Sequence, residues 1–211
     1  MAKTSSPYSA SFTGATMMFN EMNTVVSMLL KDNSSETVKK LRTDAQYLQI
    51  NSTTGRERVT SELVKRFNTV PVSFWESFVN LSEPQKRLAL LYVILKTYRL
   101  LFEFQVNLAI AKYNSIDRTI NRNDVLAAMS EIASRDSFVD SWTQNTRERA
   151  AEHYLAILKQ AGLIDTLTGE LKIPDVSDAD FIDYIKSGDL WFLQACFLPN
   201  YRIENIKQLA L

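Results

Sequence analysis

Apolar residues recur at intervals of three and four along most of the chain, the spacing that places them on one side of an α-helix. The pattern predicts helices over residues 14–31, 35–45, 54–69, 74–80, 84–113, 122–134, 137–141, 144–161, 178–187 and 189–197. The closing residues, 200–211, are compatible with either a tail or a docking helix. We therefore expect a mainly α protein.

Pairs of polar residues three positions apart mark four of these helix starts, because such pairs can bind the free N–H groups of a first turn. The pairs are Asn33 with Glu36, Ser73 with Glu76, Ser82 with Gln85, and Ser177 with Asp180. We expect a capped helix to begin at each pair.

The segment 84–113 is apolar on almost every side. As one helix it would be roughly 45 Å long, and it predicts the axis of an N-terminal bundle. Lys96, Arg99 and Glu103 fall in its middle, where charges would be costly in a membrane. We expect a buried central helix and no membrane partner, with these charges either reaching the surface or paired, as Arg99 could be with Glu103.

The polar segment Asn114–Asn121 predicts a linker between an N-terminal helical bundle, residues 1–114, and a C-terminal unit, residues 115–211. In the second unit, helix 144–161 precedes Gly162 and two short arms around Thr168 and Gly169, which are typical of a β-hairpin. A helix followed by a hairpin is the order of a winged helix-turn-helix module. We expect a winged-helix-like unit with a short β-hairpin at 163–173; a core helix followed by a connector is the alternative.

Composition limits the chemistry that the chain can perform. The single His153 and single Cys196 provide neither a structural zinc site nor a disulfide framework. The sequence has no glycine-rich phosphate loop and no motif of a nucleophilic enzyme, and its N-terminus lacks the apolar run of a signal peptide. We expect a cytoplasmic protein that is not an enzyme and needs no cofactor, with His153 on the surface and Cys196 buried and inert.

Basic and acidic residues are equal in number but unevenly distributed. Residues 1–124 contain 16 basic and 11 acidic residues, whereas residues 125–211 contain 8 and 13. The N-terminal part is therefore the better partner for a polyanion.

Basic residues on three predicted helices are the candidate nucleic-acid contacts. They are Lys39, Lys40, Arg56, Arg58, Lys65, Arg66, Arg147 and Arg149. The first six could line a phosphate-binding groove, and the last two could reach DNA from the first turn of helix 144–161.

Two features oppose this interpretation of the basic residues. Glu62 is spaced to pair with neighbouring cations, as on an ordinary solvated helix. Residues 165–189 carry seven acidic residues against two basic ones, whereas a wing that holds DNA is usually basic.

Three stretches resemble one protein family: YSASFTGATMMFNE at 8–21, LALLYVILKTYRLLFEFQVNLAIAKY at 88–113, and WTQNTRERAAEHYLAILKQAGLI at 142–164. In order and spacing they are similar to the BrxA proteins of bacterial BREX phage-defence systems, over about residues 8–175. None of the three stretches is a catalytic signature.

The resemblance implies a small, cytoplasmic, helical and non-catalytic protein that binds double-stranded DNA and acts beside other BREX defence proteins. Members of the family are also described as inner-membrane proteins, which the charges in 84–113 oppose here. Another described similarity, to a helical RNA-binding antitermination factor, would place binding on a basic helical surface, at positions Arg56, Arg58, Lys65 and Arg66. A protein-interaction scaffold and an RNA-binding protein are the alternatives to DNA binding.

Overall fold

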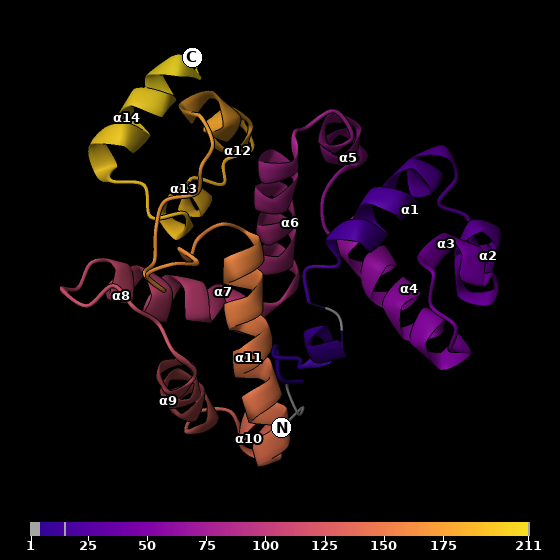
Figure 1. Ribbon diagram of the computed structural model, residues 1–211, viewed down its shortest axis with the longest axis horizontal. Coiled ribbons are helices and arrows are strands. Elements are labelled where there is room, and N and C mark those ends of the chain that lie inside the picture. The colour runs from indigo at the N-terminus through magenta and orange to yellow at the C-terminus, as the bar shows by residue number, and fades with distance from the viewer. Residues whose placement is uncertain (1–4, 15, 211) are drawn as a thin grey trace.

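The computed structural model describes residues 5–14 and 16–210, and helices make up most of them (Figure 1). The first elements are η1 (Ser11–Gly14), α1 (Phe19–Lys31), α2 (Ser35–Thr43), α3 (Ala45–Leu48), α4 (Thr53–Phe67), α5 (Val72–Phe78) and α6 (Glu83–Thr97). The chain continues with α7 (Arg99–Glu103), η2 (Phe104–Ala109), α8 (Ile110–Tyr113), α9 (Arg122–Ala133), α10 (Ser137–Asp140) and α11 (Gln144–Gln160). The last elements are η3 (Asp178–Phe181), α12 (Ile182–Lys186), α13 (Trp191–Ala195) and α14 (Asn200–Leu209). The prediction of a mainly α protein is confirmed, and α14 shows that the closing segment is a helix.

Two of the four predicted helix starts are confirmed. Gln85 Oε1 accepts a hydrogen bond from the Ser82 backbone N–H at 2.7 Å, and Asp180 Oδ2 accepts one from the Ser177 N–H at 2.7 Å. The other two are wrong by one or two residues, because Ser34 caps α2 and α5 begins directly after Pro71. The capping pairs therefore located these starts closely.

The predicted central helix is interrupted. Helix α6 ends at Thr97, and Tyr98 adopts an extended conformation with φ −122° and ψ 104° before α7 begins. Figure 1 shows α7 running crosswise to α6, and residues 104–109 then widen into a π-helix. The prediction of one straight helix is thus corrected. The apolar pattern hides the break because buried residues continue on both sides of Tyr98.

The charges inside this segment are paired with carboxylates. Lys96 Nζ lies 2.9 Å from Asp189 Oδ2, and Arg99 Nε lies 2.8 Å from Glu103 Oε1, one helical turn along. The Arg99 pair is the one that the sequence spacing predicts. Within the described residues, the structure contains no helix with the length and apolar character needed to cross a membrane.

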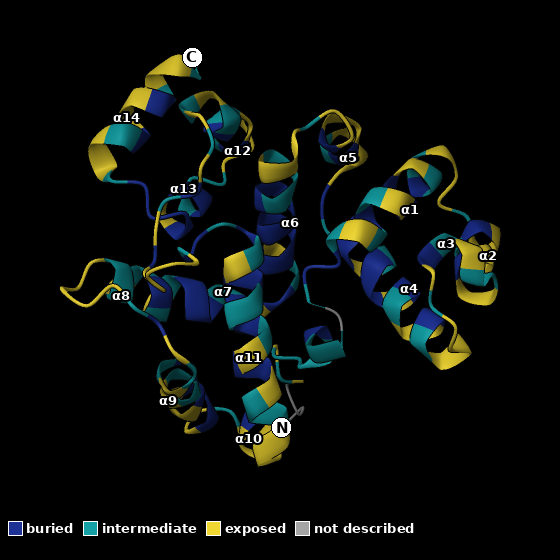
Figure 2. Ribbon diagram, viewed as in Figure 1, coloured by how far each residue is buried: buried dark blue, intermediate teal, exposed yellow. Residues whose placement is uncertain are grey.

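Helix α6 lies in the middle of the hydrophobic core. Each side chain from Leu88 to Leu95 is buried, and Figure 2 shows α6 and α7 as the central buried elements. Trp75 of α5 stacks on Phe67 of α4 with ring centroids 5.5 Å apart, and its indole N–H donates to the Phe67 carbonyl. Burial of such a side chain contributes roughly 1.5–3 kcal/mol. Cys196 is also fully buried, as the sequence predicts.

The N-terminal segment, residues 5–14, joins elements that are distant in sequence. Helix η1 packs against both α4 and α11, and Figure 1 shows it in the space between them. Phe12 is fully buried and meets the Tyr98 ring edge-on at 5.5 Å, while the Tyr8 hydroxyl donates to Glu103 at 3.0 Å. This segment therefore brings one face of α4 next to one face of α11.

The segment after α11 differs from the sequence expectation. Among the described residues there is no β-strand, and positions 163–173 take part only in two isolated bridges, Ile164 with Leu171 and Thr119 with Glu170. The Asp165 carboxylate accepts hydrogen bonds from the N–H groups of Leu167 and Thr168, which closes a turn. The two arms share backbone hydrogen bonds, from Asp165 N–H to the Glu170 carbonyl and from Lys172 N–H to the Leu163 carbonyl, but they form no strand. The predicted β-hairpin is therefore not supported. The winged-helix arrangement, which depends on that hairpin, is not supported.

Candidate nucleic-acid interface

Arg66, one of the candidate contacts, is fully buried. Its guanidinium donates to the Met17 carbonyl at 2.9 Å, to the Thr16 carbonyl at 2.8 Å and to the Tyr98 hydroxyl at 3.2 Å. The Tyr98 hydroxyl in turn donates to Glu62, and burial raises the pKa of Tyr98 well above its usual value. Arg66 therefore joins α4 to the start of α1 and offers no surface to a phosphate.

Arg56 also serves the fold. Its side chain is buried and donates to the carbonyls of Ile50 at 2.6 Å, Asn51 at 2.8 Å and Arg42 at 3.0 Å. Arg42 lies in the last turn of α2, and Ile50 and Asn51 lie in the connection that leads to α4. Arg56 thus holds that connection closed and does not contribute to an exposed basic face.

Arg147 has a comparable structural role at the start of α11. One of its terminal nitrogens donates to the Asp140 carbonyl at 2.7 Å, and its Nε donates to the Trp142 carbonyl at 3.3 Å. The guanidinium also lies 3.3 Å from an Asp140 carboxylate oxygen. Arg147 therefore stabilises the turn between α10 and α11.

Lys39 and Lys40 are exposed on α2, at the edge of the molecule away from α11 (Figure 1). Lys40 Nζ lies 3.4 Å from Glu36, one helical turn earlier. Exposed pairs of this kind contribute little to stability. These two lysines are accessible but lie apart from the other exposed candidates.

Arg58 and Arg149 approach the region of His153 from different helices. Arg58 is exposed on α4 and lies against Gly14, and Arg149 is exposed on α11, one helical turn before His153. The pKa of His153 is lowered below its usual 6.5 by burial first, then by Arg149 and Arg58, while Glu152 opposes them. Neither arginine forms an ion pair with another described residue. Two cations distant in sequence therefore create a local positive field.

His153 itself was expected on the surface, but it is half-buried. Its Nδ1 is enclosed without a hydrogen-bond partner among the described residues. The ring lines a cavity of about 480 Å³ that also includes Thr13, Asn20, Glu21 and Arg87. Hydroxyl, amide and guanidinium donors thus line this opening together with one carboxylate.

Lys65 extends this positive region along α4. Its exposed ammonium lies 3.4 Å from the Ser11 hydroxyl and 4.4 Å from the centre of the Tyr98 ring. At the other end of η1, the Arg58 guanidinium lies against Gly14. We call Arg58, Lys65, Arg149 and His153, together with residues 11–14, the η1 surface.

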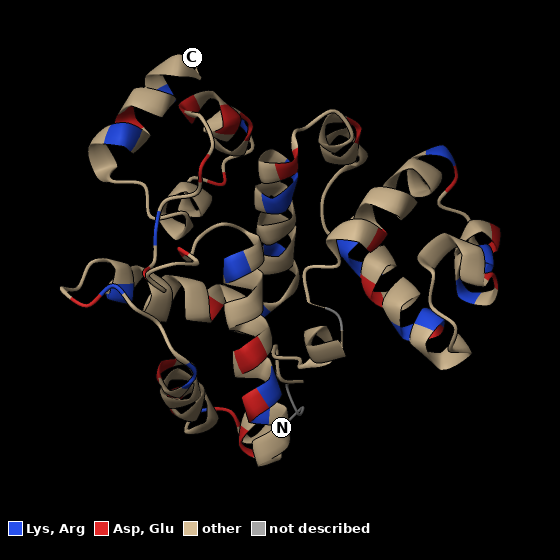
Figure 3. Cartoon of the chain, viewed as in Figure 1, with Lys and Arg blue, Asp and Glu red and all other residues tan. Residues whose placement is uncertain are grey.

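Acidic residues on α11 offset this surface only in part, through the effect of Glu152 on His153. Glu148 lies 2.5 Å from Arg122 of α9, and Glu152 lies 3.7 Å from the same guanidinium. Both carboxylates are therefore drawn towards α9. Figure 3 shows the alternating basic and acidic residues along the first half of α11.

Arg87 is a cavity residue that the sequence did not indicate. It forms a close ion pair with Glu83 at 2.7 Å, and its guanidinium lies 4.2 Å from the centre of the Phe19 ring. Its spacing from Glu83 predicts only a solvated helical pair. The contact with the start of α1 depends on tertiary packing, which the sequence pattern does not reveal.

Comparison with known proteins places the chain in a family. A family model described as BrxA matches residues 6–187. The chain belongs to the BrxA family. The matched residues of this BrxA-family chain include η1, α4 and α11, and hence all of the η1 surface.

A solved structure shares the fold. The chain is similar to the crystal structure of an uncharacterized protein from Magnetospirillum magneticum, with a TM-score of 0.77 and 20% sequence identity. The alignment covers 90% of this chain and 98% of the other. No curated protein matches the sequence. Family membership associates the protein with BREX systems.

Proposed function

We propose that this BrxA-family protein binds double-stranded DNA as a non-catalytic component of a BREX phage-defence system in the cytoplasm. The contacts are mainly to phosphates, through Arg58, Lys65 and Arg149. The observation that carries the proposal is the position of Arg58 and Arg149 beside one cavity. Arg58 lies against Gly14, which lines that cavity with His153, and Arg149 is one helical turn before His153. Within the described residues no carboxylate forms an ion pair with either arginine. Like charges gathered in this way are stabilised when an anion lies between them.

Phosphates fit this surface better than base edges do. Arginine donates to phosphate oxygens in a planar, charge-assisted geometry, and lysine adds a compact charge. The turn after α11 carries Asp165 and Glu170, whose negative charges would repel DNA. Contacts made mostly to phosphates position a protein on DNA with weak sequence preference.

The salt dependence of DNA binding tests this function. Three neutralised phosphates predict a slope of roughly −2.7 for the logarithm of the binding constant against the logarithm of salt concentration. The measurement is fluorescence anisotropy with a labelled duplex at several salt concentrations. A double variant, Arg58→Gln with Arg149→Gln, is expected to reduce the slope by roughly 2.

The chain supplies a matched control in α2. Lys39→Gln with Lys40→Gln removes the same charge from exposed positions outside the η1 surface. We expect this variant to bind the duplex almost as tightly as the wild type does. Equal losses in both double variants would show that net charge alone governs binding and would refute the proposed surface.

RNA binding is the alternative for the same surface, since no residue there distinguishes the 2′-hydroxyl of RNA. Competition between an unlabelled duplex DNA and a structured RNA decides between them. We expect the DNA to displace the labelled duplex at the lower concentration.

A further inference from the structure

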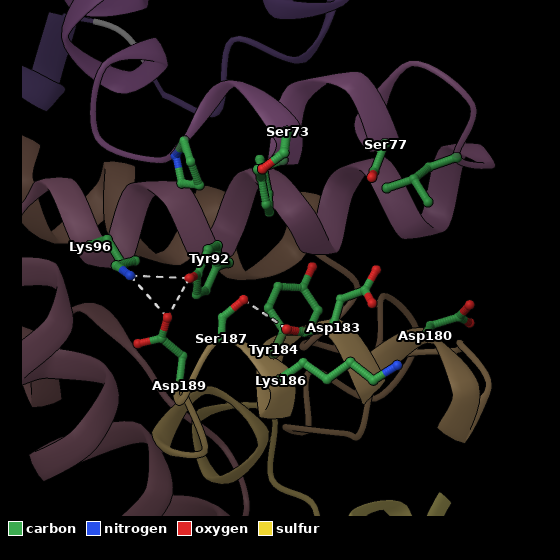
Figure 4. Close-up of a pocket in the computed structure, with 13 residues that line it drawn as sticks. Ser73, Ser77, Tyr92, Lys96, Asp180, Asp183, Tyr184, Lys186, Ser187 and Asp189 are labelled. Carbon is green, nitrogen blue, oxygen red and sulfur yellow. Dashed lines mark hydrogen bonds and ion pairs between the residues drawn. The ribbon is translucent and has the colours of Figure 1, made fainter. Parts of the chain in front are cut away.

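A second cavity, of about 490 Å³, lies on another part of the molecule, between α5 and α12 (Figure 4). Ser73 and Ser77 of α5 line one side, and residues of η3 and α12 line the other. Helix α6 contributes Tyr92 to its floor. We call this cavity the α5–α12 groove.

Aromatic rings form the floor of the groove. Phe74 stacks on Tyr92 with centroids 5.5 Å apart, and Tyr92 meets Tyr184 at 4.9 Å. Tyr92 and Tyr184 are themselves buried, whereas Phe74 and Leu81 are partly exposed and supply the apolar surface that faces the groove. An apolar side chain that binds on this floor is favoured, because its own surface and the exposed surface of the floor are both removed from water.

One end of the groove is closed by a satisfied polar network. Asp189 Oδ2 accepts hydrogen bonds from the Tyr92 hydroxyl at 2.5 Å and from Lys96 Nζ at 2.9 Å, as Figure 4 shows. Asp189 Oδ1 accepts another from the Trp191 indole at 2.8 Å. These charges are already paired, so this end gives the groove a fixed shape and leaves little capacity for an ionic ligand.

The lining carries more carboxylates than cations. Asp180, Asp183 and Asp189 line the groove, against Lys96 and Lys186. Asp183 of α12 is exposed and forms no ion pair with a described residue. Figure 3 shows acidic residues concentrated around α12. The edges therefore favour a cationic partner and disfavour a nucleic acid.

We propose that the α5–α12 groove binds a segment of a partner protein that carries an apolar anchor residue flanked by lysine or arginine. The anchor covers the exposed parts of Phe74 and Leu81, and a basic neighbour pairs with Asp183. A few well-buried anchors supply most of the energy of such contacts, while the charged edge selects the partner. This surface is independent of the proposed DNA contacts.

The experiment uses the full chain as bait for a displayed library of random peptides. We expect enriched peptides to share an aromatic or aliphatic residue next to lysine or arginine. The enriched peptides are then synthesised with a fluorescent label, and anisotropy measures how tightly they bind the wild type and the variant Ser77→Trp. The indole of this variant would fill the groove. A second variant, Asp183→Lys, reverses the charge of the edge without filling the cavity. Both variants are expected to weaken binding by about tenfold or more.

Two controls make the outcome specific. Glu170→Lys makes the same charge change on an exposed residue of the 165–170 turn, and we expect it to leave peptide binding unchanged. Arg58→Gln with Arg149→Gln should bind the peptides like the wild type, even where DNA binding is lost. If no such motif is enriched, or if the enriched peptides bind Ser77→Trp and Asp183→Lys as tightly as the wild type, the proposal is overturned.

Discussion

The guanidinium of Arg58 covers Gly14 so closely that a methyl group added at Gly14 would come within 1.5 Å of Arg58 Nη2. Gly14 ends η1, and Arg58 belongs to the second turn of α4. The missing side chain at position 14 is therefore what allows the arginine to lie across η1. This contact fixes one of the two arginines that act on His153.

Gly14→Ala should consequently weaken DNA binding through Arg58. The added methyl group forces the guanidinium away, but the flexible side chain can move without disturbing the backbone. We expect several-fold weaker duplex binding and a change in the free energy of unfolding within about 0.5 kcal/mol. Anisotropy and urea titration measure the two quantities.

A double-mutant cycle provides the control for this prediction. If Gly14→Ala acts by displacing Arg58, then Arg58→Gln should cost little further affinity in the Gly14→Ala background. Additive losses would instead show that the two residues act separately.

The two arginines Arg58 and Arg66 of α4 should differ in the property that they support. Arg66→Met removes a buried cation from the carbonyls of Thr16 and Met17, and we expect the free energy of unfolding to fall by about 3 kcal/mol or more. Arg58→Met changes an exposed side chain and should alter that energy by no more than about 0.5 kcal/mol. Urea unfolding measures both. A stable Arg66→Met variant with impaired DNA binding would contradict the structural role of Arg66.

The sequence predicted the chemistry of α4 more accurately than the direction of its side chains. It placed Arg56, Arg58, Lys65 and Arg66 on one helix, but treated all four as exposed. Arg56 and Arg66 point inward because backbone carbonyls of other segments accept their hydrogen bonds. Those segments approach α4 only after folding, so helical periodicity cannot separate the two inward residues from the two outward ones.

Helix types and positions were predictable because the apolar spacing is strong, whereas breaks and turns were not. Tyr98 interrupts a run of apolar residues that would suit one continuous helix. The turn at 165–169 has the residues of a hairpin, yet the Asp165 carboxylate binds two N–H groups in the turn. Local hydrogen bonds of this kind compete with strand pairing.

DNA binding should become tighter as the pH falls towards and below 6.5, because of His153. In the free protein, burial, Arg149 and Arg58 lower its pKa below 6.5. A phosphate between the arginines offsets their field and raises that pKa, so that binding takes up a proton. Each unit of difference between the bound and free pKa values corresponds to about tenfold in affinity.

Other charged groups near His153 could also cause a pH dependence of DNA binding, and their pKa values decide the control. Besides the two arginines, the charged groups at the cavity or its edge are Glu152 on α11, Arg87 on α6 and Glu21 on α1. Carboxylates titrate at lower pH and arginines at much higher pH. His153→Gln should therefore flatten the pH dependence between neutrality and the carboxylate range, as measured by anisotropy at constant ionic strength. An unchanged pH dependence in that variant would exclude His153 as its source.

The Asp189 network should make the stability of the protein sensitive to acid. Burial raises the pKa of Asp189, but hydrogen bonds from Tyr92, Lys96 and Trp191 outweigh it and hold the pKa below the usual 3.8. A carboxylate whose pKa is lowered in the folded state contributes stability at pH values above its pKa in the unfolded state. That stability is lost as the pH falls through its pKa in the folded state.

Asp189→Asn keeps the size of the side chain but removes the charge that balances Lys96. We expect the free energy of unfolding of this variant to be lower than that of the wild type at neutral pH. Between neutrality and pH values below 3.8, it should decrease by less than that of the wild type. Urea unfolding followed by circular dichroism measures both. Equal losses in the two proteins over that range would mean that other carboxylates control the acid sensitivity.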